Sequence, residues 1–250
     1  MKTFRILFFF LMGLGALPQS LVAQAFEDGP TEPVQEAWIQ TLTSQKSMEV
    51  YYTDRSGLLM DGTLHQGLAA IQQQLLKAFP EGFGMYEAME THQLRPNRKF
   101  VYGRYQAADG TMYASVIGWR KHSRWFKEFE AIYAEGTSSK DAVAQADRLR
   151  EQWVNLANQH DPAKIGTDLF SPEGMYFNRG TRFSSDQIGQ AYSYMSNKSF
   201  SIGLEAVMVK PINEQITYEF GIFDSGGRGM YVLIWTKTSE GWRLLLDFNF

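Results

Sequence analysis

The feature that most constrains this chain is an internal repeat, because the same helix, turn and strand signals occur twice in the same order. Trp38 and Trp153 each lie in a helical pattern of apolar residues. Each is followed by a second tryptophan, Trp125 after 87 residues and Trp242 after 89 residues. Two copies of one pattern predict two similar domains rather than one large core.

The turns and aromatic residues between these tryptophans also correspond in order. The paired segments are Gly57–Gly62 with Gly174–Gly180, Pro96–Asn97 with Pro211–Asn213, Tyr102–Gly103 with Phe220–Gly221, Asp109–Gly110 with Asp224–Gly227, and Tyr113–Trp119 with Tyr231–Trp235. The polar, glycine-bearing segment 135–139 has the composition of a linker. We therefore predict a first domain over residues 26–134 and a second over residues 140–250.

The second copy predicts an α+β domain. A long helix is expected to begin after Ser138 or Ser139 and to end near His160, and Asp161–Pro162 is typical of the start of a short helix. Four later runs have strand character, with period-2 alternation in most of them: 200–208, 216–222, 230–235 and 242–250. The short loops between the runs predict an antiparallel sheet with the helices on one face.

The N-terminus has the three zones of a secretory signal peptide. Lys2 and Arg5 precede the apolar run Ile6–Leu17, and Ala23-Gln-Ala25 provides a small-x-small cleavage site. The run is shorter than the roughly 20 residues that span a bilayer. We predict a signal peptide over residues 1–25 and a secreted or periplasmic mature protein with no membrane-spanning segment.

Composition excludes several functional classes. The 27 acidic and 24 basic residues give a formal charge of -3, which predicts no nucleic-acid partner. The chain has no cysteine, which excludes disulfides, thiol nucleophiles and cysteine–zinc sites. The histidines, His65, His92, His122 and His160, have no metal-ligand spacing. No phosphate-binding or dinucleotide motif opens a helix, so we predict neither metal nor cofactor.

Several of these signals together resemble the nuclear-transport-factor-2-like superfamily, and its SnoaL-like and ketosteroid-isomerase-like branch in particular. The signals are a tryptophan in a long first helix, a glycine-turned hairpin, a helix entered at Ser184-Ser-Asp-Gln-Ile188 with a capping box, and the closing run Gly241–Asp247. The similarity covers residues 140–250 well and 31–133 more loosely.

The resemblance implies a curved antiparallel sheet wrapped around about three helices, which forms a cone with an apolar pocket. Members of the superfamily include isomerases, cyclases, dehydratases and epoxide hydrolases, as well as non-catalytic binding and assembly domains. Because members often dimerise through their sheets, we expect the two halves to form an intramolecular pseudo-dimer.

Enzymes of this group commonly place a carboxylate in the apolar pocket, where burial raises its pKa toward neutrality. Asp247 on the last predicted strand is the candidate acid or base, with Glu205 and Glu219 on neighbouring strands and Glu130 at the matching position of the first half. Strict alternation would place these acids on the opposite, more exposed face of the sheet. The Asp and His combinations of the family's dehydratases and hydrolases are not recognisable.

The aromatic content of 14% suggests a pocket for a hydrophobic molecule, although ordinary core packing also explains it. The residues expected around the cone of the second half are Trp153, Tyr176, Tyr192, Tyr218 and Trp235. We favour non-catalytic binding of a small hydrophobic molecule. The alternatives are an isomerase, lyase or hydrolase that uses Asp247, and a structural or assembly module.

Overall fold

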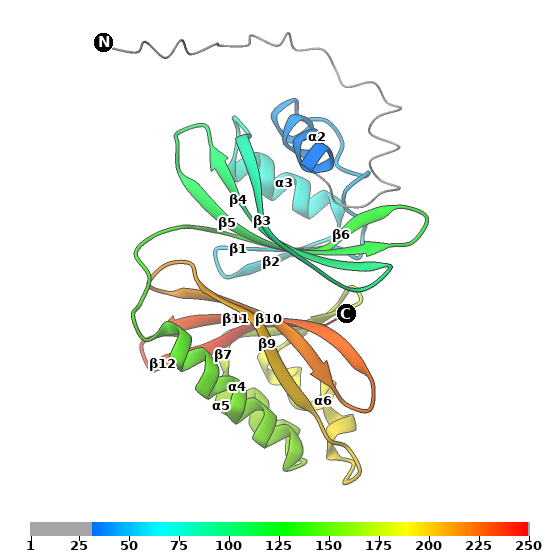
Figure 1. Cartoon of the computed structure of the whole chain (residues 1–250), viewed down its shortest axis with the longest axis vertical. Coiled ribbons are helices and arrows are strands. Elements are labelled where there is room, and N and C mark those ends of the chain that lie inside the picture. The colour runs from blue at the N-terminus through cyan, green and yellow to red at the C-terminus, as the bar shows by residue number, and fades with distance from the viewer. Residues whose placement is uncertain (1–31, 250) are drawn as a thin grey trace, which may run out of the picture.

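The computed structural model describes residues 32–249, so the predicted signal peptide, residues 1–25, lies outside the described part of the chain. The chain forms two α+β halves (Figure 1). Their sheets lie against each other in the middle of the molecule, and the helices of each half cover the outer face of its own sheet. The layers therefore follow the order helix, sheet, sheet, helix.

The first half contains two helices and six strands within the described residues. They are α2 (Glu32–Thr43), β1 (Gly57–Met60), β2 (Thr63–Gln66), α3 (Leu68–Ala78), β3 (Phe83–Arg95), β4 (Arg98–Ala107), β5 (Met112–Lys121) and β6 (Trp125–Ala134). Trp38 in α2, Ile71 and Leu75 in α3 are fully buried at helical spacing, which is why these segments dock on the sheet as helices.

The second half repeats this order of strands. Its elements are α4 (Ala142–Asn158), α5 (Pro162–Leu169), β7 (Phe170–Asn178), β8 (Thr181–Ser184), η1 (Ser185–Gln187), α6 (Ile188–Ala191), η2 (Ser193–Ser196), β9 (Gly203–Pro211), β10 (Ile216–Asp224), β11 (Arg228–Thr238) and β12 (Gly241–Asn249). The helix predicted after Ser184 is broken into three short pieces. At its start the Gln187 side chain accepts a hydrogen bond of 3.1 Å from the Ser184 backbone N–H, as in a capping box.

Both sheets have the same strand order, β2-β1-β6-β5-β4-β3 and β8-β7-β12-β11-β10-β9. The four strands joined by short hairpins are antiparallel, as predicted. The first strand of each half, however, pairs in parallel with the last one. The sheet is mixed because a helix carries the chain from the first hairpin to the far edge, and the four-strand meander then returns to the first strand from that edge.

The contact between the two sheets is apolar and aromatic. Phe129 stacks on Phe248 with ring centroids 4.8 Å apart, and Phe100 contacts Phe220 at 4.6 Å. Polar contacts also cross it, since the Tyr218 hydroxyl donates to the Ala114 carbonyl at 3.2 Å. Each sheet is therefore covered on both faces, by helices on one side and by the other sheet on the other.

Within residues 32–249, no helix combines the length and the apolar character needed to cross a membrane.

Candidate functional site

A β-bulge decides where Asp247, the acidic residue of the last strand, points. In β12, Leu244 pairs with Trp235 and Leu246 pairs with Ile234, so Leu245 is an extra residue between them. The bulge interrupts the period-2 alternation. Leu244 packs with the helices, whereas Leu246 packs with the other sheet. Asp247 follows Leu246 and therefore faces the helices.

The prediction that these acids lie on an exposed face is wrong for Asp247, Glu219 and Glu130. Their exposed fractions are 2%, 0% and 0%. The larger apolar residues of these strands face the other sheet, and the acids point into the cone under the helices. Glu205, on the edge strand β9, is exposed as predicted.

Asp247 lies in an apolar site and has one unused oxygen. Its Oδ2 accepts a short hydrogen bond from the Tyr192 hydroxyl, and its buried Oδ1 has no partner among the described residues. Burial raises the pKa of Asp247 to about 7, the Tyr192 hydrogen bond opposes this shift, and the nearby Glu219 adds to it. A carboxyl group in this environment exchanges a proton near neutral pH.

Asp247 lines a small pocket of about 50 Å³ at one end of the cone. Most of its lining is aromatic or aliphatic. The lining residues are Trp153, Tyr194, Ile202, Leu204, Phe223, Ser225, Tyr231, Leu233, Asp247 and Asn249. The Tyr194 side chain is 53% exposed, and Leu204 and Phe223 are half-buried, so these three form the side of the pocket toward solvent.

The second acid of this half, Glu219, is fully partnered. It accepts hydrogen bonds from the Tyr231 hydroxyl at 2.9 Å and from Trp235 Nε1 at 2.8 Å, and Arg150 Nη1 lies 3.0 Å away. Burial raises the pKa of Glu219, and Arg150 is the main opposing influence. Glu219 therefore holds α4 on the sheet, while Asp247 keeps a free oxygen.

Glu130, which occupies the position of Asp247 in the first half, is fully partnered, as Glu219 is. A bulge at Glu128 turns Lys127 and Glu130 to the same face of β6, where Lys127 Nζ lies 3.0 Å from both Glu130 oxygens. The Tyr105 hydroxyl donates to Glu130 at 2.7 Å, and the Tyr52 hydroxyl makes a short hydrogen bond to it. Burial lowers the pKa of Lys127 to about 8, against the attraction of Glu130.

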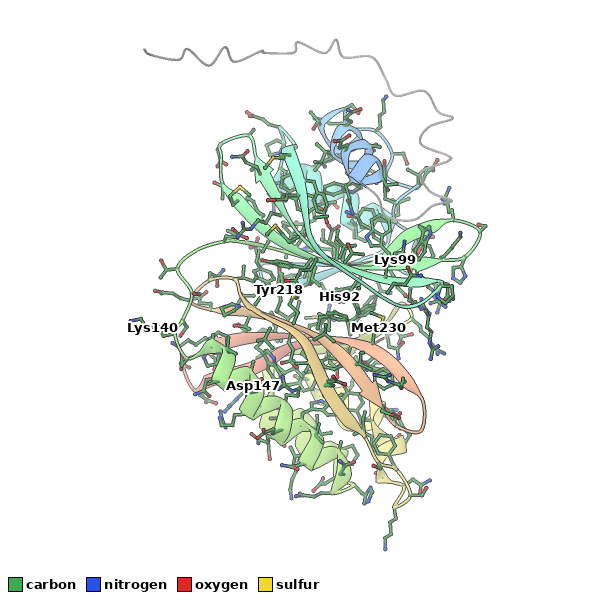
Figure 2. All side chains as sticks on the ribbon, in the orientation of Figure 1. His92, Lys99, Lys140, Asp147, Tyr218 and Met230 are labelled. Atoms are coloured by element: carbon green, nitrogen blue, oxygen red, sulfur yellow. The ribbon has the colours of Figure 1, made fainter. Side chains whose placement is uncertain are left out.

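The predicted aromatic residues separate into two groups. Trp153 lines the pocket, and Tyr176, Tyr192 and Trp235 belong to the same cluster beneath the helices. Tyr192 contacts Trp153 edge-on at 6.0 Å. The prediction that Tyr218 lines this cone is wrong. Tyr218 precedes Glu219 and therefore lies on the opposite face of β10, against the other sheet (Figure 2).

Sequence reasoning missed Tyr231, Arg150 and Lys127 as partners of the buried acids. A signal for Arg150 is present in the sequence, because it is a cation in the long helix three residues before the buried Trp153, a spacing that places both on one side of the helix. Lys127 carries no such signal, since a lysine three residues from a glutamate in a regular strand would lie on the opposite face. Within the described residues, no cluster of three or more His, Asp or Glu residues could hold a metal ion.

Solved structures of this fold type match about one half of the chain. A domain of unknown function with a cystatin-like fold from Nostoc punctiforme PCC 73102 is 14% identical, with a TM-score of 0.40 over 45% of this chain and 78% of its own. An NTF-2-like protein of unknown function from Shewanella oneidensis MR-1 is 14% identical, with a TM-score of 0.39 over 43% of this chain and 97% of its own. A DUF4783 family protein from Bacteroides uniformis ATCC 8492 is 17% identical, with a TM-score of 0.35 over 41% of this chain and 98% of its own. No protein-family model and no curated protein matches the sequence.

Each half has the curved six-stranded sheet and one-sided helices that the resemblance to nuclear-transport-factor-2-like domains implies. The architecture of the two halves therefore confirms the prediction of two tandem α+β domains, each with a curved sheet packed on helices, and this agreement concerns the fold alone.

Proposed function

We propose that the second half of this protein binds a small, mainly apolar molecule in the Asp247 pocket. One observation carries the proposal: Asp247 lines a pocket with mostly apolar walls, and its Oδ1 is buried without a partner among the described residues. A buried polar atom without a hydrogen bond costs about 1–3 kcal/mol. A ligand that bonds to this oxygen would recover that free energy.

The size of the pocket restricts the ligand and its mode of entry. A volume of about 50 Å³ holds a few water-sized groups, whereas an apolar cavity that binds benzene measures roughly 150 Å³. A ring-sized ligand therefore requires the side chains toward solvent, Tyr194, Leu204 and Phe223, to swing outward. The exposed ring of Tyr194 has room for this movement.

The protonation state of Asp247 defines the polar part of the ligand. With a pKa of about 7, the carboxyl group is protonated in a large fraction of molecules at neutral pH. The protonated form donates to a carbonyl or ether oxygen, and the ionised form accepts from a hydroxyl group. The preferred ligand thus has an apolar body and one such group.

A second candidate function is proton-transfer catalysis by Asp247 as general acid or base, with Tyr192 as the hydrogen-bonding neighbour. A pKa close to neutral favours this role, because general acids and bases work best near the ambient pH. A pH–rate profile with a limb near 7 that disappears in Asp247→Asn would distinguish catalysis from binding alone.

The third possibility, assembly through the sheets, has less support. The apolar faces that would mediate it are buried between the two halves of the same chain, as expected for an intramolecular pseudo-dimer.

The signal-like N-terminus further suggests that the protein acts outside the cytoplasm.

The test is a binding screen of the mature protein, residues 26–250, against phenols, cyclic ketones and short aliphatic alcohols by saturation-transfer NMR. Leu204→Trp fills the solvent side of the pocket and is expected to abolish binding. Asp247→Asn is expected to change affinity at least fivefold, since a hydrogen bond contributes about 1 kcal/mol.

The matched control is Glu205→Gln. It changes the exposed residue that follows Leu204 in β9, and this variant should bind like the unmodified protein. Absence of binding across the panel would contradict the proposal. So would equal binding by the unmodified protein and by the Leu204→Trp and Asp247→Asn variants.

A further inference from the structure

The two halves jointly gather arginine and lysine side chains at one end of the molecule, although the chain as a whole is acidic. The basic residues come from hairpin turns, β3–β4 and β5–β6 in the first half and β7–β8 and β10–β11 in the second, and from the segment before β1. They are Arg55, Arg95, Arg98, Lys99, Arg120, Lys121, Arg124, Arg179 and Arg228. We call this set the basic end.

Contacts between the halves bring these hairpins together. Arg95 Nη2 donates to the Arg228 carbonyl at 2.7 Å, and the Arg55 guanidinium donates to the Arg179 carbonyl at 3.0 Å through Nε. Figure 2 labels Lys99 on this side of the molecule, with Lys140 on the opposite side. The basic end therefore exists only when the two sheets are packed.

At its centre, positive charges lie close together with one acidic partner. Glu128, the bulged residue of β6, accepts from Arg98 at 2.9 Å and from Arg120 at 2.6 Å. Burial lowers the pKa of Arg98, Glu128 opposes this shift, and Arg120, Arg179 and Arg95 each add to the lowering by repulsion. Glu128 is shared by two arginines, so a net positive charge faces solvent here.

Toward solvent, the rim of the basic end is formed by exposed arginines. Arg55, Arg95, Arg124, Arg179 and Arg228 are all exposed. Exposed acids also lie beside these arginines: Asp54 precedes Arg55, the Glu49 backbone carbonyl accepts from Arg124, and Asp224 Oδ1 accepts from the Gly226 N–H. A cluster of this size attracts the negative charge of phosphate groups.

The aromatic residues favour a charged surface over bases as the partner. Proteins that bind single-stranded nucleic acid stack bases on exposed aromatic rings. At the β5–β6 turn the rings of Trp125 and Phe126 are 2% and 8% exposed, and His122 stacks on Phe126 at 5.4 Å. The large hydrophobic side chains exposed in residues 32–249 include no aromatic ring on these hairpins.

We propose that the basic end docks the protein onto an anionic phospholipid surface, through arginines that both halves contribute. Each basic residue close to such a surface strengthens binding about fivefold. The β10–β11 hairpin carries both Arg228 of the basic end and Ser225 of the Asp247 pocket, but the docking proposal rests on the arginines and does not depend on the function proposed for that pocket.

The test is co-sedimentation of residues 26–250 with vesicles of phosphatidylcholine alone or mixed with phosphatidylglycerol, at low and at physiological salt. The test variant is Arg124→Gln/Arg179→Gln/Arg228→Gln. It keeps the contacts between the halves, because those bonds use the backbone carbonyls of Arg179 and Arg228. The matched control, Lys140→Gln/Arg148→Gln/Lys198→Gln, removes the same charge from exposed positions elsewhere.

We expect binding that requires phosphatidylglycerol, weakens with salt, falls at least tenfold in the test variant and is unchanged in the control. Absence of sedimentation with anionic vesicles would overturn the proposal, as would equal losses in the two triple variants. An oligonucleotide labelled with a fluorophore serves as a competing probe. Binding to the oligonucleotide without binding to vesicles would assign the basic end to nucleic acid instead.

Discussion

Replacing Asp247 by asparagine is expected to stabilise the protein at alkaline pH and to do so less as the pH falls. The carboxyl group is 2% exposed, and its pKa is raised to about 7 from an ordinary value of 3.8. The folded state therefore holds this proton more tightly than the unfolded state. Unfolding releases the proton between these two pKa values, so its contribution to stability is complete below pH ~4 and is lost as the pH rises to ~7.

The magnitude follows from the shift. About three pKa units correspond to about 4 kcal/mol of unfolding free energy lost between the two ends of this window. Asparagine has nearly the same shape, can accept the Tyr192 hydrogen bond and does not ionise. The asparagine variant should therefore avoid the loss, whatever constant cost the substitution adds at every pH.

The assay is urea denaturation of the unmodified protein and Asp247→Asn at about pH 5 and about pH 8, which spans roughly 3 kcal/mol of the effect. The quantity of interest is the change with pH in the difference between the two proteins, because the contributions of other groups cancel in it. Glu205→Gln, which alters an exposed carboxylate, should show no such change. If the difference in unfolding free energy between Asp247→Asn and the unmodified protein stayed constant from pH 5 to pH 8, the conclusion that burial raises the pKa of Asp247 would be refuted.

Three further substitutions test the packing around the site. Lys127→Met leaves the buried Glu130 without its cation and should lower the free energy of unfolding by about 3–5 kcal/mol in urea denaturation. Adding Glu130→Gln should recover part of that loss, and a double variant no more stable than the single one would contradict the pairing. Gly221→Ala would place a Cβ against the Tyr231 hydroxyl and should lower the free energy of unfolding by about 1–3 kcal/mol. The loss would be seen as a lower melting temperature, and an unchanged melting temperature would argue against this close approach. Phe129→Ala removes a fully buried ring between the sheets and should cost about 3–5 kcal/mol, so a loss below about 1 kcal/mol in the same denaturation assay would mean that the sheets do not pack as described.

The two halves share one fold but differ in how the buried acid of the last strand is partnered. In the first half, the acid of the last strand is neutralised by Lys127 and held by two tyrosine hydroxyls. In the second half, Leu244 occupies the position of Lys127, since each pairs with the tryptophan of the preceding strand, and Asp247 keeps a free oxygen. A lysine inside one cone and a leucine inside the other explain why the proposed site belongs to the second half.

Much of the fold could be predicted from local signals. Apolar residues at helical spacing identified α3 and α4, and period-2 runs identified the last strands of the second half. The repeat was visible in the sequence because glycines at equivalent positions of the two halves have the same structural role. Gly103 and Gly221 each lie beneath a tyrosine hydroxyl, of Tyr86 and Tyr231, where no Cβ fits.

The direction of the buried acids could not be predicted from the same signals. A bulge adds one residue to a strand, and it depends on how that strand pairs with its neighbour. Strict alternation therefore placed Asp247 and Glu130 on the wrong face. The prediction for Tyr218 was wrong for a related reason, because an aromatic residue suits the interior of a cone and a sheet–sheet contact equally well.

By itself, the sequence determined the α+β class, the duplication and the approximate places of the strands, since these depend on periodicity and turn residues within short segments. The tertiary structure alone decided which faces are buried, which acid keeps a free oxygen and where the arginines gather. Those properties depend on contacts between residues far apart in the chain. The packing of one sheet on the other buries the inner face of each and brings hairpins of both halves to one end.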